Sequence, residues 1–308
     1  MNSAMRVDDV CAVIVAYRPE LALLREVVAC VVGQVGRLLI FDNASMDMSV
    51  DYDGYLSEVG DGYVTVLRSE ENVGLGAAIN HAARFAAEAG FSYLLILDQD
   101  SLLDPDMVQT LRSRLVELQA GMPVAAVGAC FRDVRTGEQA PFVKIGFPLN
   151  RKLYGSPGEV IDCDFLISSG SLIPLTVLET VGGMDAGLFI DNVDLEWSFR
   201  AKYHGYRLYG ICDAGMRHRI GDRLRKVPLL RHPVVVHGPL RLYYMMRNRV
   251  ILYRRRETPG RWIAQDVPRL LLKLVGMSLF VTPRLENARR MLQGLWHGVR
   301  GRLGRYPD

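Results

Sequence analysis

An apolar run that ends in two carboxylates constrains the fold of this 308-residue chain more than any other feature. Residues 94–97 are four consecutive aliphatic side chains, and Asp98 and Asp100 follow them directly. A continuous apolar run of this kind predicts a strand that is buried on both faces, as in a parallel sheet covered by helices. The two carboxylates should therefore lie at the carboxyl edge of a sheet, where open α/β folds bind their ligands.

Two carboxylates so close together at this edge favour a bound cation. They repel each other, and their burial costs desolvation energy, unless a positive ion joins them. A hard divalent metal together with a phosphate-bearing substrate would offset both costs. The alternative is an ordinary acidic turn after the strand, because Asp-rich loops are common. This segment alone does not decide between the two interpretations.

Strands and helices alternate along the chain up to about residue 130. Apolar patterns predict strands over 10–16, 37–41, 63–67, 94–98 and 124–128, and helices over 19–31, 74–89 and 105–119. Elements of these lengths in this order imply right-handed βαβ crossovers and an α/β fold with a mostly parallel central sheet flanked by helices. Residues 131–160 predict a hairpin or a mobile loop, and residues 163–171 predict a further strand.

Charge is distributed unevenly, although the net charge is only +3. Residues 217–308 contain 21 of the 37 Lys and Arg residues and 5 of the 34 Asp and Glu residues, which gives them +16 and leaves −13 for the rest. We therefore predict a catalytic domain over 1–238 and a basic amphipathic helical region over 239–308 that faces an anionic partner. Interleaved Leu, Trp, Phe and Tyr favour a membrane surface over nucleic acid, for which no binding module is recognisable. The alternative is that these helices pack on the catalytic domain.

The composition predicts a cytoplasmic protein that does not cross a membrane. Five Cys residues, an odd number without a C-x-x-C pair, favour reduced thiols over a disulfide scaffold or a zinc site. The first nine residues lack the apolar core of a signal peptide. The best apolar stretch, 270–281, is interrupted by Lys273 and bounded by Pro268 and Pro283, which makes it too short to span a bilayer.

Polar residues also follow the first two predicted strands and open the second predicted helix. Ala16-Tyr17 and Asp42-Asn43 could hold a flat base between them, with Asp42 accepting the imide N–H of uracil or thymine, although turns often use such residues. The segment from Asn72 to Asn80 contains Gly74 and Gly76, whose backbone N–H groups could approach an anion or a sugar. A glycine-bearing turn before a packing helix is the alternative.

Two further acids occur in the segment 189–200. Asp191 and Asp194 are i, i+3 neighbours, so a helix would place them on one face. Flanking Phe189, Leu195 and Trp197 are apolar, and an acid beside apolar groups has a raised pKa that suits a general base. The alternative is that the acids complement the dipole at a helix N-terminus.

The segment 215–222 contains a histidine among arginines and glycines. Neutral His218 could complete a metal shell begun by Asp100, and Arg217 or Arg219 could hold phosphate. A lone histidine is more often structural.

Taken in order, these motifs resemble glycosyltransferase family 2, the inverting enzymes of GT-A fold. The matching segments are V-I-V-A-Y, D-N-A-S, N-x-G-x-(x)₄-N, L-D-Q-D-S, S-S-G-S-L-I-P, G-G-M-D, F-I-D-N-V-D-L-E-W-S-F-R and H-R-I-G-D. Within the family the chain is most similar, over about residues 9–255, to bacterial rhamnosyltransferases that use dTDP-L-rhamnose to build O-antigen, the polysaccharide of lipopolysaccharide, and related polymers. Tyr243, Tyr244, Arg247 and Asn248 also resemble a C-terminal signature of these enzymes, for which the sequence predicts no chemical role.

The resemblance implies roles for the candidate residues. Asp98-Gln99-Asp100 matches the D-x-D motif, so that Asp100 would bind Mg²⁺ or Mn²⁺ at the diphosphate, Asp98 would face the ribose or the metal, and His218 would take the third metal position. Asp194 matches the catalytic base, and Asp191 is the alternative because typical members carry an E-D pair where this chain has Val193-Asp194. The predicted nucleotide-sugar contacts are Ala16, Tyr17, Asp42, Asn43, Asn72, Gly74, Asn80, Asp98, Gln99 and Arg217.

The implied activity is inverting transfer of a sugar, L-rhamnose from dTDP-L-rhamnose, onto a saccharide acceptor. The acceptor would be linked to a lipid diphosphate, and the enzyme would lie on the cytoplasmic face of the bacterial inner membrane. A nucleotidyltransferase of similar topology is an alternative, but Tyr17-Arg18-Pro19 lacks the Gly-rich basic loop that it needs. A catalytically silent, membrane-associated binding protein is another.

Overall fold

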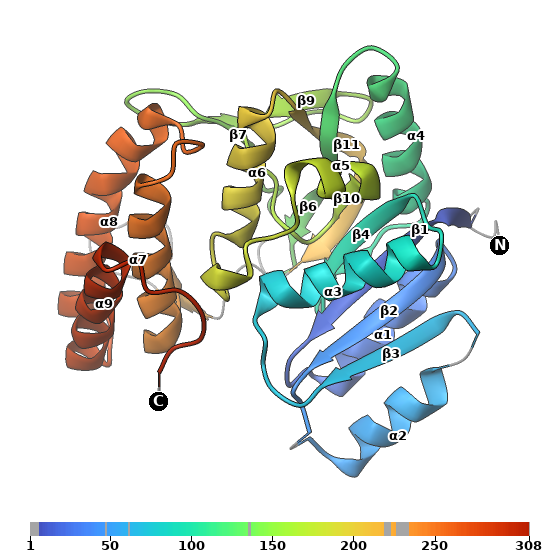
Figure 1. Ribbon diagram of the computed structural model, residues 1–308, viewed down its shortest axis with the longest axis horizontal. Coiled ribbons are helices and arrows are strands. Elements are labelled where there is room, and N and C mark those ends of the chain that lie inside the picture. Colours follow the sequence, from blue (N-terminus) through green and yellow to red (C-terminus); the bar gives the residue numbers. More distant parts are fainter. Residues whose placement is uncertain are drawn as a thin grey trace.

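A nine-stranded mixed sheet forms the centre of the molecule, which is known from a computed structural model (Figure 1). The structure describes residues 6–46, 48–60, 62–134, 137–218, 223–225 and 234–307. The strands of the sheet are β1 (Val7–Ala16), β2 (Val35–Asn43), β3 (Val64–Ser69), β4 (Tyr93–Asp98), β5 (Leu102–Leu103), β6 (Val124–Asp133), β9 (Val160–Cys163), β10 (Ser171–Pro174) and β11 (Arg207–His218).

Two short antiparallel pairs lie outside this sheet. They are β7 (Phe142–Lys144) with β8 (Arg151–Leu153), and β12 (Arg223–Arg225) with β13 (Val234–Val236). The helices are α1 (Leu21–Val32), α2 (Val50–Val59), α3 (Leu75–Glu88), α4 (Met107–Gln119), α5 (Leu175–Val181), α6 (Val193–Tyr203), α7 (Pro239–Tyr253), α8 (Gly260–Phe280) and α9 (Arg284–Val299), with a 3₁₀ turn at Ala186–Leu188.

The strand order is β3-β2-β1-β4-β10-β6-β11-β5, and β9 pairs with β11. Strands β1, β2, β3, β4, β6 and β11 run in one direction, and β10, β5 and β9 run against them. The sheet is therefore mostly parallel, as predicted. In the register, Ala16 lies beside Asp42 and Val15 beside Asp98, so β1, β2 and β4 end at one edge.

The apolar runs are buried on both faces of the sheet, as their sequence predicts. Residues 94–97 are all fully buried, and their side chains alternate between two apolar cores. Helices α1, α2 and α4 pack on one face, whereas α3, α5 and α6 pack on the other (Figure 1). These layers leave the polar carboxyl edge of β1, β2 and β4 open for a site.

Three details differ from the sequence predictions. Helix α2 was not predicted, because its apolar periodicity is weak. The first helix begins at Leu21, so Pro19 precedes it. The strand predicted over 163–171 is wrong: β9 ends at Cys163 and β10 begins at Ser171. The intervening chain turns at Gly170, which has φ 80°, and the hydroxyl of Ser169 accepts a hydrogen bond from the backbone N–H of Asp98 at 3.0 Å.

Residues 131–160 contain the β7–β8 hairpin, one of the two predicted alternatives.

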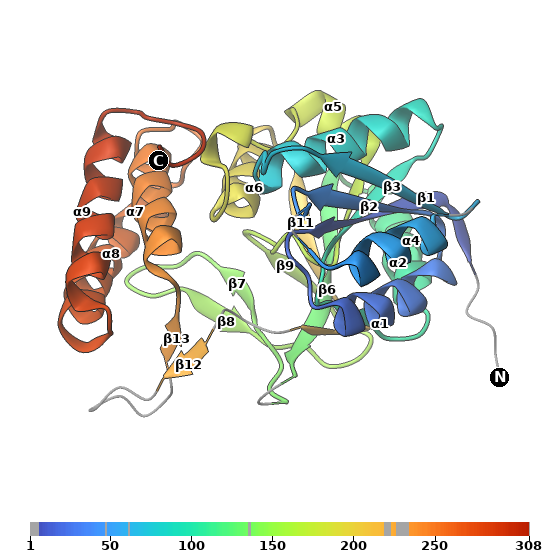
Figure 2. The same cartoon turned by 90° about the horizontal axis from the view of Figure 1, so that it is seen from below.

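The C-terminal helices α7, α8 and α9 stack beside α6 in both views (Figures 1 and 2). They share a small apolar core of their own, which includes Leu242, Met246 and Met291. They also join the apolar core on the sheet face that α3, α5 and α6 cover, because Trp262 packs edge-on against Phe199 of α6 with ring centroids 5.3 Å apart. No helix among the described residues is both long and apolar enough to cross a bilayer.

Candidate active site

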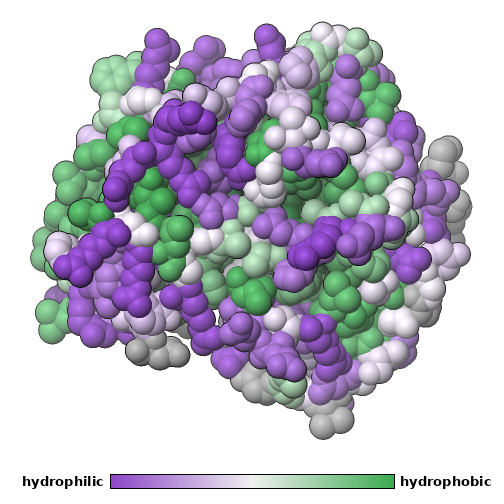
Figure 3. Space-filling model, viewed as in Figure 1, coloured by the Kyte–Doolittle hydropathy of each residue, from purple (hydrophilic) through white to green (hydrophobic). Residues whose placement is uncertain are grey.

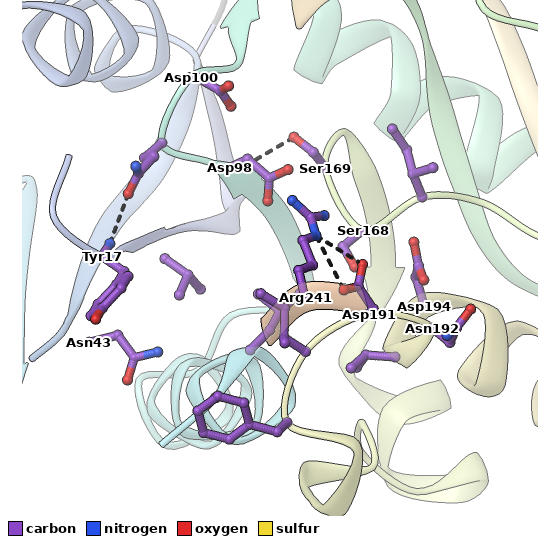
Figure 4. Close-up of a pocket in the computed structure, with 18 of the residues that line it drawn as sticks. Tyr17, Asn43, Asp98, Asp100, Ser168, Ser169, Asp191, Asn192, Asp194 and Arg241 are labelled. Carbon is purple, nitrogen blue, oxygen red and sulfur yellow. Dashed lines mark hydrogen bonds and ion pairs between the residues drawn. The ribbon is translucent and has the colours of Figure 1, made fainter. Parts of the chain in front are cut away.

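A pocket of about 730 Å³ opens at the carboxyl edge of β1, β2 and β4. Its walls come from the ends of these strands, from the turn before β10, from the segment leading into α6, and from α7. In Figure 4, Asp98 and Asp100 lie on one side of the pocket and Asp191 and Asp194 lie on the other. Carboxylates separated by more than ninety positions in the sequence therefore face a common space.

The strand-edge side of the pocket holds six of the predicted nucleotide-sugar contacts. They are Tyr17, Asn43, Asn72, Gly74, Asp98 and Gln99. The amide oxygen of Gln99 accepts a hydrogen bond from the backbone N–H of Tyr17 at 2.8 Å, which ties the end of β1 to the end of β4. Tyr17 is 44% exposed, and its phenol ring presents a flat surface to the pocket (Figure 4).

Asn43 and Asn72 shape the turn that precedes α3. The Nδ2 atom of Asn43 donates to Oδ1 of Asn72 at 3.1 Å, and the Oδ1 atom of Asn43 accepts from the backbone N–H of Val73 at 2.9 Å. Gly74 has φ 83°, and a Cβ atom there would lie 2.6 Å from the carbonyl oxygen of Phe189. Glycine is therefore required here by backbone conformation and by contact with another wall of the pocket.

Four of the predicted contacts lie outside the described lining of the pocket. Ala16 and Asp42 are buried, and Asp42 accepts a hydrogen bond from the backbone N–H of Ser45 at 3.1 Å. Asn80 makes two hydrogen bonds with the backbone of Met184, at 2.7 and 2.8 Å. Arg217 is exposed near the end of β11.

The predicted metal ligands are placed only in part. Asp98 and Asp100 both line the pocket, and the hydroxyls of Ser101 and Ser169 lie 2.7 Å apart beside them. His218 is the last residue of β11, and its side chain and Arg219 lie outside the described residues. Within the part of the chain that the structure describes, no cluster of three or more His, Cys, Asp or Glu side chains could hold a metal.

Asp194 lies in the first turn of α6, where a carboxylate complements the helix dipole. Its Oδ1 atom accepts a hydrogen bond from the backbone N–H of Leu195 at 2.8 Å. Burial within the pocket wall nevertheless raises the pKa of Asp194 to about 6, and the nearby charges of Asp191 and Asp98 contribute to the rise. Backbone hydrogen bonds from Leu195 and Ser168 only partly oppose this shift of the pKa.

Asp191 has a different environment. Both of its carboxylate oxygens lie 3.2 Å from the Nε atom of Arg241, which reaches from α7 into the pocket (Figure 4). Asp191 is thus held in an ion pair, whereas the described hydrogen bonds to Asp194 come from the backbone. The two acids that the sequence left as alternatives are therefore distinguished by their partners.

Several lining residues were not among the predicted site residues. They are Phe131, Ile167, Ser168, Ser169, His237 and Arg241, together with neighbours of the predicted residues. The S-S-G-S segment could have indicated the two serines, because it belongs to the ordered motif set. Arg241 lies in an arginine-rich helical region with no local signal that separates it from its neighbours.

The fold and the site agree with the comparisons to known proteins. The family described as Glycosyl transferase family 2 matches residues 11–175, more than half of the chain, and the chain belongs to this family. It is 27% identical over 302 residues to the dTDP-rhamnosyl transferase RfbF of Shigella flexneri, a match that covers 96% of this chain and 97% of that protein. The chain is therefore a glycosyltransferase that takes its sugar from a nucleotide sugar. This result disfavours the two alternatives that the sequence left open, a nucleotidyltransferase and a catalytically silent binding protein.

Solved structures of low sequence identity share the fold. The structure of GalNAc-T7 with UDP, GalNAc and Mn²⁺ superposes with a TM-score of 0.61 at 12% identity, over 97% of this chain and 57% of that one. Residues 1–349 of Staphylococcus aureus TarS in complex with UDP-GlcNAc superpose with a TM-score of 0.57 at 15% identity, over 95% and 81% of the chains. This chain thus spans little more than half of GalNAc-T7, and the GT-A fold predicted from the sequence is confirmed.

Proposed function

We propose that this glycosyltransferase moves L-rhamnose from dTDP-L-rhamnose onto a hydroxyl group of a saccharide acceptor, with inversion at the anomeric carbon. The observation that carries the proposal is one pocket that holds Asp98 and Asp100 on one side and a carboxylate with a raised pKa, Asp194, on the other. The similarity to RfbF along nearly the whole chain supports dTDP-rhamnose as the donor.

Asp194 acts as the general base in this proposal. With a pKa of about 6 it is mostly ionised near pH 7, yet it is basic enough to accept a proton from the acceptor hydroxyl as that oxygen attacks the sugar. Asp191 is less suited, because its charge is already shared with Arg241. Since one displacement inverts the anomeric carbon, the chain needs no covalent nucleophile.

The strand-edge side binds the nucleotide diphosphate. Tyr17 offers an aromatic face to the base, and Asn43 and Asn72 keep the adjoining turn in place. Asp98 and Asp100 fit a divalent cation, because Mg²⁺ sites use one or two carboxylates and complete their shell with substrate phosphates. Mg²⁺ or Mn²⁺ bound there would neutralise negative charge on the departing diphosphate.

The acceptor in this proposal is a saccharide on a lipid diphosphate, and α8 and α9 rest on the anionic membrane that holds it. Large apolar side chains are exposed along one side of each helix: Leu271, Leu272, Val275 and Leu279 in α8, and Leu285, Leu292, Trp296 and Val299 in α9. On the side of the molecule where Figure 1 shows the C-terminal helices, the surface carries both hydrophobic and hydrophilic patches (Figure 3). Arg284, Arg289 and Arg300 are also exposed in or directly after α9, and exposed apolar side chains together with arginine are typical of helices that lie at a membrane interface.

The donor assignment is tested by a thermal-shift panel of dTDP-L-rhamnose, UDP-GlcNAc and UDP-GalNAc, each with and without Mn²⁺. We expect dTDP-L-rhamnose with Mn²⁺ to raise the melting temperature most, because a ligand that binds the folded state stabilises it by mass action. Transfer is then measured as release of dTDP in the presence of acceptor. Equal stabilisation by all three donors, or a preference for a UDP-sugar, would reject dTDP-rhamnose.

The membrane assignment is tested by sedimentation with vesicles that contain anionic phospholipid. We expect Leu272→Glu and Trp296→Ala each to reduce the bound fraction, because both side chains are more than half exposed on the apolar sides of α8 and α9. Val134→Glu is a control, since this exposed residue follows β6, outside the C-terminal helices. Equal loss in the control, or no loss in the variants, would contradict membrane binding through this surface.

A further inference from the structure

Two buried polar residues of α7 face the segment that carries the candidate base. Arg247 and Asn248 are both 0% exposed, and the Nε atom of Arg247 donates to Oδ1 of Asn248 at 2.9 Å. A buried guanidinium is costly unless its donors find acceptors. The acceptors used by this pair are mainly carbonyl oxygens of residues 187–191.

Asn248 gathers three of these carbonyls around one amide nitrogen. Its Nδ2 atom donates to the oxygens of Leu188 at 3.0 Å, Ile190 at 2.8 Å and Asp191 at 2.8 Å. Three carbonyl oxygens from a segment of four residues can point at one atom only if the chain is tightly bent. Asn248 therefore fixes the shape of this segment without using any of its side chains.

Arg247 binds the same segment through its guanidinium group. Its Nη2 atom donates to the oxygens of Leu188 at 2.7 Å and Gly187 at 3.2 Å, and its Nη1 atom donates to the oxygen of Gly304 at 2.5 Å. The backbone N–H of Gly304 in turn donates to the oxygen of Gly187 at 2.7 Å. The C-terminal tail is thus part of the same hydrogen-bonded unit.

The bend that these bonds enclose is one that the chain would not adopt unaided. Phe189, Asp191 and Asn192 have φ values of 65°, 63° and 60°, in the left-handed region that side chains with a Cβ atom disfavour. The ring of Phe189 stacks on Tyr244 with centroids 5.1 Å apart, which adds an apolar contact to the polar ones. Asp194 follows this bend directly, in the first turn of α6.

We propose that Arg247 and Asn248 are positioning residues of the transferase, which hold residues 187–192 in their bent conformation and so aim Asp191 and Asp194 into the pocket. The inference rests on the proposed function, because it takes Asp194 as the general base of the reaction. Neither Arg247 nor Asn248 lines the described pocket, so both act through the backbone that they bind. This role accounts for Tyr244, Arg247 and Asn248 of the C-terminal signature, for which the sequence predicted no chemical role.

The test compares Asn248→Leu with a matched control, Asn287→Leu. Asn287 is also buried, and its Nδ2 atom donates to the carbonyl of Val281 at 2.9 Å, within the junction of α8 and α9. Both substitutions therefore remove a buried amide that binds backbone oxygens, at nearly constant volume. Only Asn248 contacts the segment that precedes Asp194.

We expect Asn248→Leu to lower kcat about tenfold to hundredfold per folded molecule, as small displacements of catalytic groups do. The affinity for dTDP should stay within about threefold, because the nucleotide binds the opposite side of the pocket. The acidic limb of the kcat profile should move to lower pH, because looser packing admits water to Asp194 and relieves the burial that raises its pKa. Asn287→Leu should lower the melting temperature and leave these three quantities unchanged.

A second variant and a second measurement separate positioning from stability. Arg247→Lys keeps the positive charge but lacks the fork that reaches several carbonyls, so it should lower kcat in the same direction. Hydrogen exchange of the amides in 187–192 should become faster in both α7 variants and stay unchanged in Asn287→Leu. Unchanged exchange there, or a loss of kcat no greater than in the control, would overturn the positioning role. If the wild-type protein transfers no rhamnose, the proposed function fails, and the exchange measurement still decides whether the pair holds the segment.

Discussion

The two sides of the pocket are built by different means. On one side, Tyr17, Asn43 and Asp98 are placed at or just beyond the ends of parallel strands, whose register aligns them at one edge of the sheet. On the other side, Asp191 and Asp194 are placed by a bend with left-handed residues that hydrogen bonds from α7 hold together. Regular structure therefore positions the side proposed to bind the nucleotide, and long-range contacts position the proposed base.

Because the two sides are built differently, we expect substitutions on them to affect binding and turnover to different extents. Strand ends are supported by a buried ladder and by two apolar cores, so a single polar substitution there should change binding without moving the backbone. The bend before α6 is conformationally strained, so its geometry depends on contacts made by residues about sixty positions further along the chain. Substitutions on this side should change turnover more than binding.

The largest effect is expected for Asp194→Asn. Loss of the proposed general base should lower kcat about 10²- to 10⁴-fold, while affinity for dTDP with Mn²⁺ stays near the wild-type value. Steady-state rates and calorimetry on the same sample check both parts. Asp53→Asn is the control and should retain full activity, because Asp53 of α2 forms an exposed ion pair with Arg68 of β3. Near-normal turnover of Asp194→Asn would transfer the role of base to Asp191.

Asp100→Ala should act on the other side of the pocket. It removes a predicted metal ligand, so the Mn²⁺-dependent part of dTDP affinity should fall about tenfold or more, the scale of one charge-assisted contact. Calorimetry with dTDP, with Mn²⁺ or with EDTA, measures this difference. Affinity that is independent of Mn²⁺ in the wild-type protein would contradict metal binding at this edge.

Gly74→Ala tests the point where the two sides touch. The backbone N–H of Leu75 donates to the oxygen of Phe189 at 2.6 Å, and an added Cβ atom at Gly74 would clash with that same residue. We expect a loss of about 2–4 kcal/mol in the free energy of unfolding, from strain at positive φ together with the clash. Gly90→Ala is the matched control, because Gly90 has φ 81° and open space around it.

Urea denaturation should show about 1 kcal/mol for Gly90→Ala, which reports the cost of the positive φ alone. A similar loss in both variants would mean that the bend before α6 yields to the added methyl group without cost. That result would weaken the view that this bend is rigidly held.

The smallest expected effect is a pH-dependent gain in stability for Asp194→Asn. The pKa of Asp194 is about 6 in the folded protein against an ordinary value of 3.8, so the folded state binds this proton more tightly than the unfolded chain does. The stabilisation that the protonated carboxyl group of Asp194 gives to the folded state is complete at pH values below 3.8, and it is lost as the pH rises through 6. At pH 7.5 the wild-type protein therefore carries a desolvated negative charge that the variant lacks.

We compare the free energy of unfolding of Asp194→Asn with that of the wild type at two pH values. The variant's advantage should be about 1–3 kcal/mol larger at pH 7.5 than at pH 4. Urea titrations at the two pH values measure this difference. A difference that is equal at both pH values would mean that the carboxylate is not desolvated. Asp194 would then lack the environment that a general base requires.

The sequence predictions succeeded where regular strands place the residues and failed where contacts between distant segments bend the chain. The aliphatic run before Asp98 predicts its own burial, because only a covered sheet buries four consecutive apolar residues, and the position of the acid at its end then follows. The wrong strand over 163–171 shows the opposite case. Its pattern looked continuous, but Gly170 turns the chain, and Ser169 bonds to β4 instead of extending a ladder.

By itself the sequence determined the parallel half of the sheet, the edge at which its polar ends meet, and the resemblance to the transferase family, because apolar periodicity and short motifs are local properties. Only the tertiary structure decided that Asp191 pairs with Arg241, that Asp194 is desolvated, and that Arg247 and Asn248 hold the bend between these acids and the rest of the fold. These are contacts between distant segments, and their energies depend on burial and geometry that arise only when the layers have packed.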